Sequence, residues 1–236
     1  MKKILTIMII LFLTTACTAN ASIQTNTNKG TGEKTAYNYL DSIDESLIEQ
    51  AGVDGDFAYD MSDPNKLKEN STNVFVAKVT SIDSATCNLE GYDYSPVPYT
   101  LGKLEILKNY VGEAKETVTF SRVGGTVTME EYDRNAPSEA VAKREYNRTQ
   151  QGTKAAEYMK VIFNDDIELT AGETYLFYAN YNSEYDRYEI IGLEYGSRQL
   201  ENFDSTAEVV ADSVTILNNV TGQKDSFSTY VKDYLD

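Results

Sequence analysis

The stretch NVFVAKVTSI at residues 73–82 decides the fold of this chain. β-branched side chains dominate it and polar residues bound it, a pattern typical of a β-strand. Six further stretches have the same character, and they cover residues 99–107, 117–123, 126–129, 156–163, 174–181 and 188–193. Several short strands separated by turns predict a mainly β fold, either a barrel or a sandwich.

Two short segments between these stretches have the composition of turns. The pair Gly124-Gly125 separates two expected strands, and glycines at such a point allow a barrel strand to bend. Residues 182–186 separate the last two strands and are expected to form a hairpin loop.

Over residues 71–201, the chain resembles a family of uncharacterised secreted or lipid-anchored proteins of Gram-positive bacteria. The segments that carry the resemblance are STNVFVAKVTSI, LEILKNYVGE, TFSRVGG, LTAGETYLFY and YEIIGLEYG. The resemblance implies a small closed OB-like β-barrel, similar in outline to the barrel of netrin-like inhibitor domains, and it brings no catalytic residues. This chain departs from the family pattern in a longer turn at residues 109–111 and in a long insert at residues 130–155.

The first residues have the pattern of a bacterial export signal. Lys2 and Lys3 precede an apolar run at residues 4–13, and ten helical residues span only about 15 Å, half of a bilayer core. Thr14-Thr15-Ala16 before Cys17 is similar to a lipobox, so we expect residues 1–16 to be removed and Cys17 to be lipidated. The alternative is cleavage after residue 21, directly after the A-x-A pattern at residues 19–21, which would secrete the protein.

The expected location is therefore the extracytoplasmic face of the cell membrane, with a lipid on Cys17 as the anchor. Residues 17–34 are polar and poor in hydrophobic side chains, which predicts a disordered tether. Without residues 1–16, the formal net charge falls from −16 to −18, because Lys2 and Lys3 are lost. Such an acidic surface repels phosphate backbones and anionic lipid, so we expect no nucleic-acid partner.

Helical patterns flank the strands. Residues 35–70 are expected to form an N-terminal helical segment, with apolar residues at helical spacing up to Leu47 and a second helix from Asp63-Pro64 to about Asn70. The insert at residues 130–155 is polar and is expected to protrude, with a possible helix start near Ala140. Residues 202–236 form a C-terminal extension, and its amphipathic helix has an apolar stripe at Phe227, Tyr230, Val231, Tyr234 and Leu235.

The residues that most enzymes use are missing. The chain has no histidine, no serine followed three residues later by lysine, and no P-loop, so we expect a non-catalytic protein without a cofactor. Cys87 has neither a disulfide partner nor a histidine to activate it. The acidic run from Asp54 to Asp63 lacks the glycine and glutamate of an EF-hand and is better explained as a solvated loop than as a metal site.

Two segments are candidates for a binding surface. Tyr92, Tyr94 and Tyr99 surround two prolines in one loop, and exposed tyrosines offer a large contact area at a low entropy cost. The insert carries a local positive charge from Arg134, Lys143, Arg144 and Arg148, which could contact a cell-wall polymer or an acidic surface protein. Buried strand tyrosines and a solvated helix face are the structural alternatives.

We therefore expect a binding module on the cell surface. Two other functions stay open at this point: a cell-envelope hydrolase that uses a pair of carboxylates, and a structural protein of the envelope.

Overall fold

The computed structural model describes residues 36–152, 155–207 and 209–236. The expected signal at residues 1–16, its alternative at 1–21, the lipidation site Cys17 and the tether at 17–34 lie outside the described residues.

Strand β3 (Asn73–Thr86) organises the large sheet because both of its faces are buried. Val74 and Val76 point to one apolar cluster, and Phe75 and Ala77 point to another, as the alternation of side chains along a strand requires. A strand that is buried on both sides has a continuous apolar sequence, which is why residues 73–79 contain so few polar residues.

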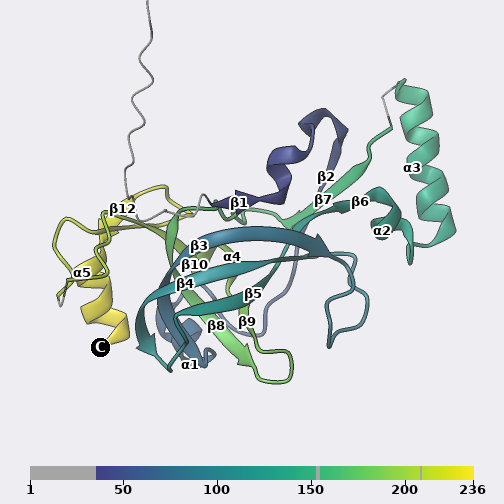
Figure 1. The fold of residues 1–236 in the computed structure, drawn as a ribbon. Coiled ribbons are helices and arrows are strands. Elements are labelled where there is room, and N and C mark those ends of the chain that lie inside the picture. Colours follow the sequence, from purple (N-terminus) through teal and green to yellow (C-terminus); the bar gives the residue numbers. More distant parts are fainter. Residues whose placement is uncertain (1–35, 153–154, 208) are drawn as a thin grey trace, which may run out of the picture. The chain divides into compact units, whose positions relative to one another are not determined.

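Five strands close a ring of hydrogen bonds, which we call the strand ring (Figure 1). Its members, in order around the ring, are β3, β4 (Tyr99–Val111), β5 (Thr117–Val123), β9 (Arg187–Ile190) and β8 (Thr174–Asn182), and β8 pairs again with β3. The β5–β9 pair is parallel and the other four pairs are antiparallel. The expectation of a mainly β fold is confirmed, and each strand predicted within the ring is present.

The inside of the strand ring is filled by large apolar side chains. Phe75 lies at its centre, 5.5 Å from the aromatic ring of Tyr188 and 6.2 Å from that of Phe177. Leu104 and Phe120 close the packing from β4 and β5, and both are almost fully buried.

Strand β10 and the C-terminal extension that follows it continue the same sheet past β8. Strands β10 (Ser197–Glu201), β11 (Thr215–Leu217) and β12 (Lys224–Ser226) lead into helix α5 (Phe227–Tyr230) and the π-helical turn η3 (Val231–Leu235). The predicted apolar stripe is confirmed, because Phe227, Tyr230 and Leu235 are buried against the outer face of β3 and β8. The hydroxyl groups of Tyr230 and Tyr178 lie 2.9 Å apart within this layer.

A second sheet begins where the chain leaves the strand ring. Gly124 has a φ of 91° and Gly125 a φ of 157°, and after this bend β6 (Gly125–Thr128) joins β7 (Tyr158–Phe163) and β2 (Ile48–Val53) in a three-stranded sheet. The left-handed conformation at Gly124 is one that side chains with a Cβ rarely adopt, so the bend needs this glycine.

The prediction of a helical segment at residues 35–70 is wrong for its first half. Strand β1 (Tyr37–Asn38) is followed by two short 3₁₀ turns, η1 (Tyr39–Ser42) and η2 (Glu45–Leu47), and then by β2. The side chains of Asn38 and Asp44 cap the starts of these turns, because they accept hydrogen bonds from the amides of Leu40 and Ser46. β2 then forms a parallel ladder with β7 over its whole length, which a helix could not do.

The second half of this segment agrees with the prediction. Helix α1 (Pro64–Glu69) begins with Asp63 as the N-cap, whose carboxylate accepts a hydrogen bond from the Asn65 amide at 2.9 Å. Leu67 fixes the helix to the core and is fully buried.

The insert is helical, as its sequence suggests. It contains α2 (Met129–Asp133) and α3 (Ser138–Gln151), and α3 projects from the end of the small sheet (Figure 1). A last short helix, α4 (Leu193–Gly196), follows β9. None of the helices in the described ranges has the length and apolar character needed to cross a membrane.

Candidate functional site

A pocket of about 310 Å³ lies over the β5–β9 pair, and we call it the aromatic pocket. Four aromatic side chains line it, together with an apolar base and one carboxylate. The lining residues are Phe57, Ala58, Tyr59, Met61, Leu89, Tyr92, Tyr99, Ser121, Val123, Glu189, Ile190, Ile191, Gly192 and Leu193.

One wall of the aromatic pocket comes from the Tyr/Pro loop at residues 87–98. Backbone hydrogen bonds fold this loop back on itself, from the Tyr92 amide to Leu89 at 3.0 Å and from the Ser95 amide to Cys87 at 2.9 Å. The aromatic rings of Tyr92 and Tyr99 then lie 5.9 Å apart. The structure thus brings two of the three predicted loop tyrosines together in one pocket.

Glu189 fixes the orientation of Tyr92. The Tyr92 hydroxyl donates a hydrogen bond of 2.6 Å to Glu189 Oε2, and this bond, together with partial burial, raises the pKa of Tyr92 to about 12. The other oxygen of Glu189 accepts hydrogen bonds from Asn182 and Arg187. Both oxygens of this carboxylate are therefore engaged in holding the pocket in shape.

The opposite wall comes from residues 57–61, which sequence reasoning missed. Phe57 is 47 % exposed, and its aromatic ring lies 5.8 Å from that of Phe163. Met61 is buried at the foot of this wall. The sequence does carry a signal here, because Phe57, Tyr59 and Met61 alternate with polar or small residues within the acidic run from Asp54 to Asp63.

Tyr94 has a different role from the one predicted. Its hydroxyl donates a hydrogen bond of 2.8 Å to the backbone oxygen of Tyr132 on α2. Tyr94 is not among the residues that line the aromatic pocket. Glu131, also on α2, accepts hydrogen bonds from the Thr86 hydroxyl and the Cys87 amide. Helix α2 is therefore hydrogen-bonded to the start of the Tyr/Pro loop, at Thr86 and Cys87, and to its middle, at Tyr94.

The four basic residues of the insert do not meet these tyrosines. Arg144 forms an ion pair with Asp133, and Arg148 pairs with Glu49 at 3.1 Å, so acidic neighbours already offset two of the four charges. Lys143 lines a separate cleft of about 700 Å³ between α3 and the small sheet together with these two arginines, while Arg134 lies outside that cleft and is exposed. The predicted binding surface is therefore divided into two places.

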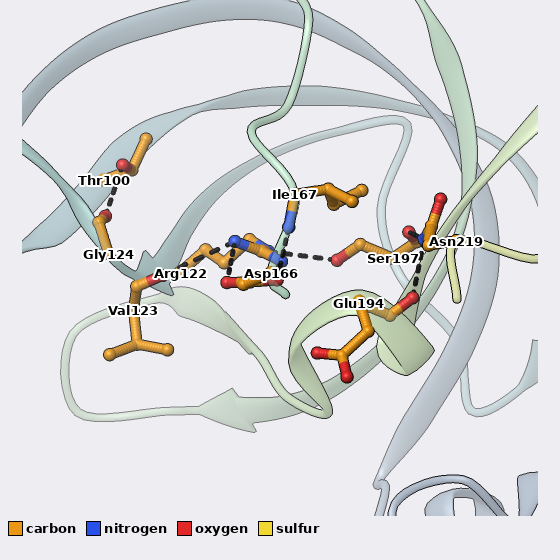
Figure 2. A network of polar contacts seen from close by, with 9 residues as sticks. All are labelled: Thr100, Arg122, Val123, Gly124, Asp166, Ile167, Glu194, Ser197 and Asn219. Atoms are coloured by element: carbon orange, nitrogen blue, oxygen red, sulfur yellow. Dashed lines mark hydrogen bonds and ion pairs between the residues drawn. The ribbon is translucent and has the colours of Figure 1, made fainter. Parts of the chain in front are cut away.

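A buried polar network surrounds Arg122 on β5 (Figure 2). Arg122 donates hydrogen bonds to both oxygens of Asp166 and to Ser197 Oγ at 3.1 Å. Asn219 donates to the backbone oxygens of Glu194 and Ser197 at 2.6 and 2.9 Å, which joins α4 to the C-terminal extension.

Glu194 takes part in this network through its backbone oxygen, and the residue is buried. Burial is the main reason why the pKa of Glu194 is raised, and the nearby Asp166 carboxylate raises it further. Leu193, the preceding residue, has a φ of 47° and lines the aromatic pocket, so α4 contacts the network on one side and the pocket on the other.

Among the described residues, no three histidine, cysteine, aspartate or glutamate side chains are grouped as ligands of a metal ion would be. Asp54 binds Asn164 and Asp60 binds Ser62 through hydrogen bonds. The carboxylates of the acidic run thus take part in local structure.

Comparison of the chain with protein-family models, with curated proteins and with solved structures finds no match in any of the three.

Proposed function

We propose that this protein is a lipid-anchored binding module on the extracytoplasmic face of the cell membrane, and that it acts without catalysis. The observation that carries the proposal is the aromatic pocket, where Phe57 and Tyr92 are 47 % and 45 % exposed above an apolar base. Exposed aromatic side chains around an apolar recess are typical of recognition surfaces.

We also propose that the strand ring is an OB-like barrel. Along the chain, its first three strands are consecutive neighbours, and the fifth strand, β9, lies between the third and the fourth. A five-stranded Greek-key ring of this kind supports the resemblance to secreted and lipid-anchored proteins of Gram-positive bacteria. The loop after the first strand and the hairpin before the last one then carry the residues available for binding.

The chemistry of the aromatic pocket favours an apolar group as its ligand. Met61, Leu89 and Leu193 are buried at its base, and its carboxylate is already bound by Tyr92, Asn182 and Arg187. An exposed apolar group on a surface protein or on a cell-wall polymer would fit this lining. The net charge of −16 disfavours a nucleic-acid ligand.

In the aromatic pocket, the arrangement of carboxylates supports binding over the alternative of a hydrolase. A carboxylate pair for glycoside hydrolysis needs two acidic groups that face a shared substrate cleft. Glu189 is the one carboxylate that lines the aromatic pocket, and Asp166 is held in the interior by Arg122. A purely structural role in the envelope would leave the exposed aromatic residues without a purpose.

Photo-crosslinking in intact cells tests the binding role. With 4-benzoylphenylalanine in place of Phe57 in the full-length chain, we expect a covalent product of defined mass, and Tyr92→Ala should weaken it strongly. The control carries the photoprobe at Tyr146, which is 64 % exposed on α3. Equal labelling from both positions would contradict the proposal, and release of soluble fragments from isolated cell walls by the purified protein would favour the hydrolase.

The anchor is tested separately with Cys17→Ala. We expect this variant to appear in the culture medium while the unchanged chain stays with the membrane fraction. Retention of the variant in the membrane fraction would exclude lipidation of Cys17 as the anchor. Cleavage after residue 21 predicts a third pattern, in which the unchanged chain is already found in the medium.

A further inference from the structure

We propose that a second pocket, at the end of the strand ring where β4 turns into β5, binds a neutral saccharide. This pocket has a volume of about 560 Å³, within the range of small-molecule sites, and we call it the polar pocket. Its lining includes Asn73, Gly112, Glu113, Lys115, Tyr181 and Asp186. It shares no lining residue with the aromatic pocket, so this inference goes beyond the function proposed above.

Asn73 provides an unused hydrogen-bond donor at this site. The residue is only 6 % exposed, and its side-chain oxygen accepts a hydrogen bond from the Thr72 hydroxyl at 2.9 Å. Its Nδ2 group donates to no other residue in the part of the chain that the structure describes. A ligand hydroxyl in the pocket can accept a hydrogen bond from this amide in place of solvent.

The turn after β4 lies directly against Asn73 because it contains a glycine. Gly112 has a φ of 69°, and a Cβ at this position would lie 2.3 Å from Asn73 Nδ2 and 2.7 Å from the backbone oxygen of Thr72. A larger residue would therefore displace Asn73 or the turn, which together form one edge of the polar pocket.

Tyr181 supplies an aromatic surface whose position is already fixed. Its aromatic ring lies 4.9 Å from that of the buried Tyr188, and its hydroxyl donates a hydrogen bond of 2.6 Å to Asp186. The side chain is nevertheless 38 % exposed. An aromatic face held in place on one side and open on the other is suited to stacking against the apolar face of a sugar ring.

The charges around the polar pocket favour an uncharged ligand. Lys115 forms an ion pair with Asp186 at 3.7 Å, and Lys103 forms one with Asp83 at the same distance. Two lysines and two carboxylates line the pocket in all, so it is close to neutral on a protein with a net charge of −16. Thr117 and Thr119 from β5 also line the pocket; the Thr119 hydroxyl donates to the backbone oxygen of Asp186 at 2.9 Å and can still accept a hydrogen bond from a ligand hydroxyl.

The test is a titration of the purified protein with three neutral hexasaccharides, maltohexaose, cellohexaose and N-acetylated chitohexaose, followed by ¹H–¹⁵N NMR. We expect at least one of them to shift the side-chain amide signals of Asn73 and the backbone amides of residues 181 and 188. Tyr181→Ala should weaken this binding about tenfold, whereas Tyr181→Phe, which keeps the aromatic face, should retain most of it. The dispersion of each variant's spectrum shows whether it is folded.

Two control variants separate this site from the rest of the surface. Tyr146→Ala removes a tyrosine that is 64 % exposed on α3, and Tyr92→Ala alters the aromatic pocket, and both should bind the saccharide as the unchanged protein does. The proposal is overturned if none of the three hexasaccharides shifts these signals, if the shifts map to another face, or if a folded Tyr181→Ala variant binds as well as the unchanged protein. Failure of the Phe57 photo-crosslink would leave this result unaffected.

Discussion

Arg122 and Asp166 face each other inside the protein through two contacts, Nη1–Oδ2 at 3.0 Å and Nη2–Oδ1 at 2.5 Å. The Arg122 side chain is 6 % exposed and that of Asp166 is fully buried. The pair joins the end of β5 to the segment after β7, so it holds the strand ring and the small sheet together. Loss of one member would leave an uncompensated charge in the interior.

We expect Arg122→Met to lower the free energy of unfolding by about 3–5 kcal/mol, because Asp166 would keep a buried charge without a partner. Urea denaturation monitored by circular dichroism measures the change. Arg122→Met combined with Asp166→Leu should recover part of the loss, since the unpaired carboxylate is then absent. As a control, Lys66→Met breaks the exposed ion pair with Glu69 and should cause no measurable change, and an equal effect of both substitutions would contradict the argument.

The raised pKa of Glu194 predicts a pH dependence of stability. The Glu194 carboxyl group keeps its proton in the folded state at a pH where it has already lost it in the unfolded state. The contribution of Glu194 to the free energy of unfolding is therefore fully present below the ordinary carboxyl pKa, and it is lost as the pH rises through the raised pKa. Glu194→Gln should therefore be more stable than the unchanged protein at neutral pH, and the gain should shrink on acidification.

Denaturation curves recorded from acidic to neutral pH measure this change in stability. Asp204→Asn is a control whose effect on stability should depend on pH in the opposite direction. The pKa of Asp204 is lowered by hydrogen bonds from Thr206, so its contribution is present above the ordinary carboxyl pKa and is lost as the pH falls. A pH-independent effect of Glu194→Gln would show that its carboxyl group titrates alike in the two states.

Cys87 should react slowly with thiol reagents. Burial raises its pKa to about 11, and the Glu131 carboxylate adds to the shift, so little thiolate is present near neutral pH. In a Cys17→Ala background, where Cys87 is the remaining cysteine, Ellman's reagent should label the native protein far more slowly than the protein in urea. Tyr94→Ala removes the hydrogen bond to Tyr132 and should speed up native labelling, whereas Tyr92→Ala should not.

Helix α3 is expected to be dispensable for folding. Thr128 and Tyr158 are paired in the small sheet, so a short Gly-Ser linker in place of residues 134–154 can connect β6 to β7 through α2. This variant should still unfold in one cooperative transition on heating. A larger deletion that also removes α2 should disturb the NMR signals of residues 87–98, because Glu131 and Tyr132 hold that loop, and loss of folding in the smaller deletion would contradict the prediction.

The strands of the ring could be predicted because their residues alternate toward two buried faces, as at Val74 and Phe75, and this information is local. The strand at residues 48–53 could not, since its partner is β7, about a hundred residues further along the chain, and the apolar residues just before it also fit a helix. The three-residue strands β11 and β12 are too short to leave a pattern.

The candidate site could be predicted only in part, because some of its residues are close together along the chain and others are not. Tyr92 and Tyr99 stand close together along the chain, and their loop could be identified as one unit. Phe57 and Glu189 line the same pocket but lie far apart along the chain, and no sequence pattern links them. The polar pocket likewise combines Asn73, Gly112 and Tyr181, which only the closure of the strand ring brings together.

The pairing of Phe75 with Phe177 closes the strand ring, and it joins positions roughly a hundred residues apart. A nascent chain on the ribosome therefore holds β3, β4 and β5 for a considerable time before β8 is synthesised. During that interval the apolar inner faces of these strands have no complete covering, and exposed apolar surface of this kind favours aggregation. The two pockets can form only after β8 and β9 have been made, so a truncated translation product would have neither of them.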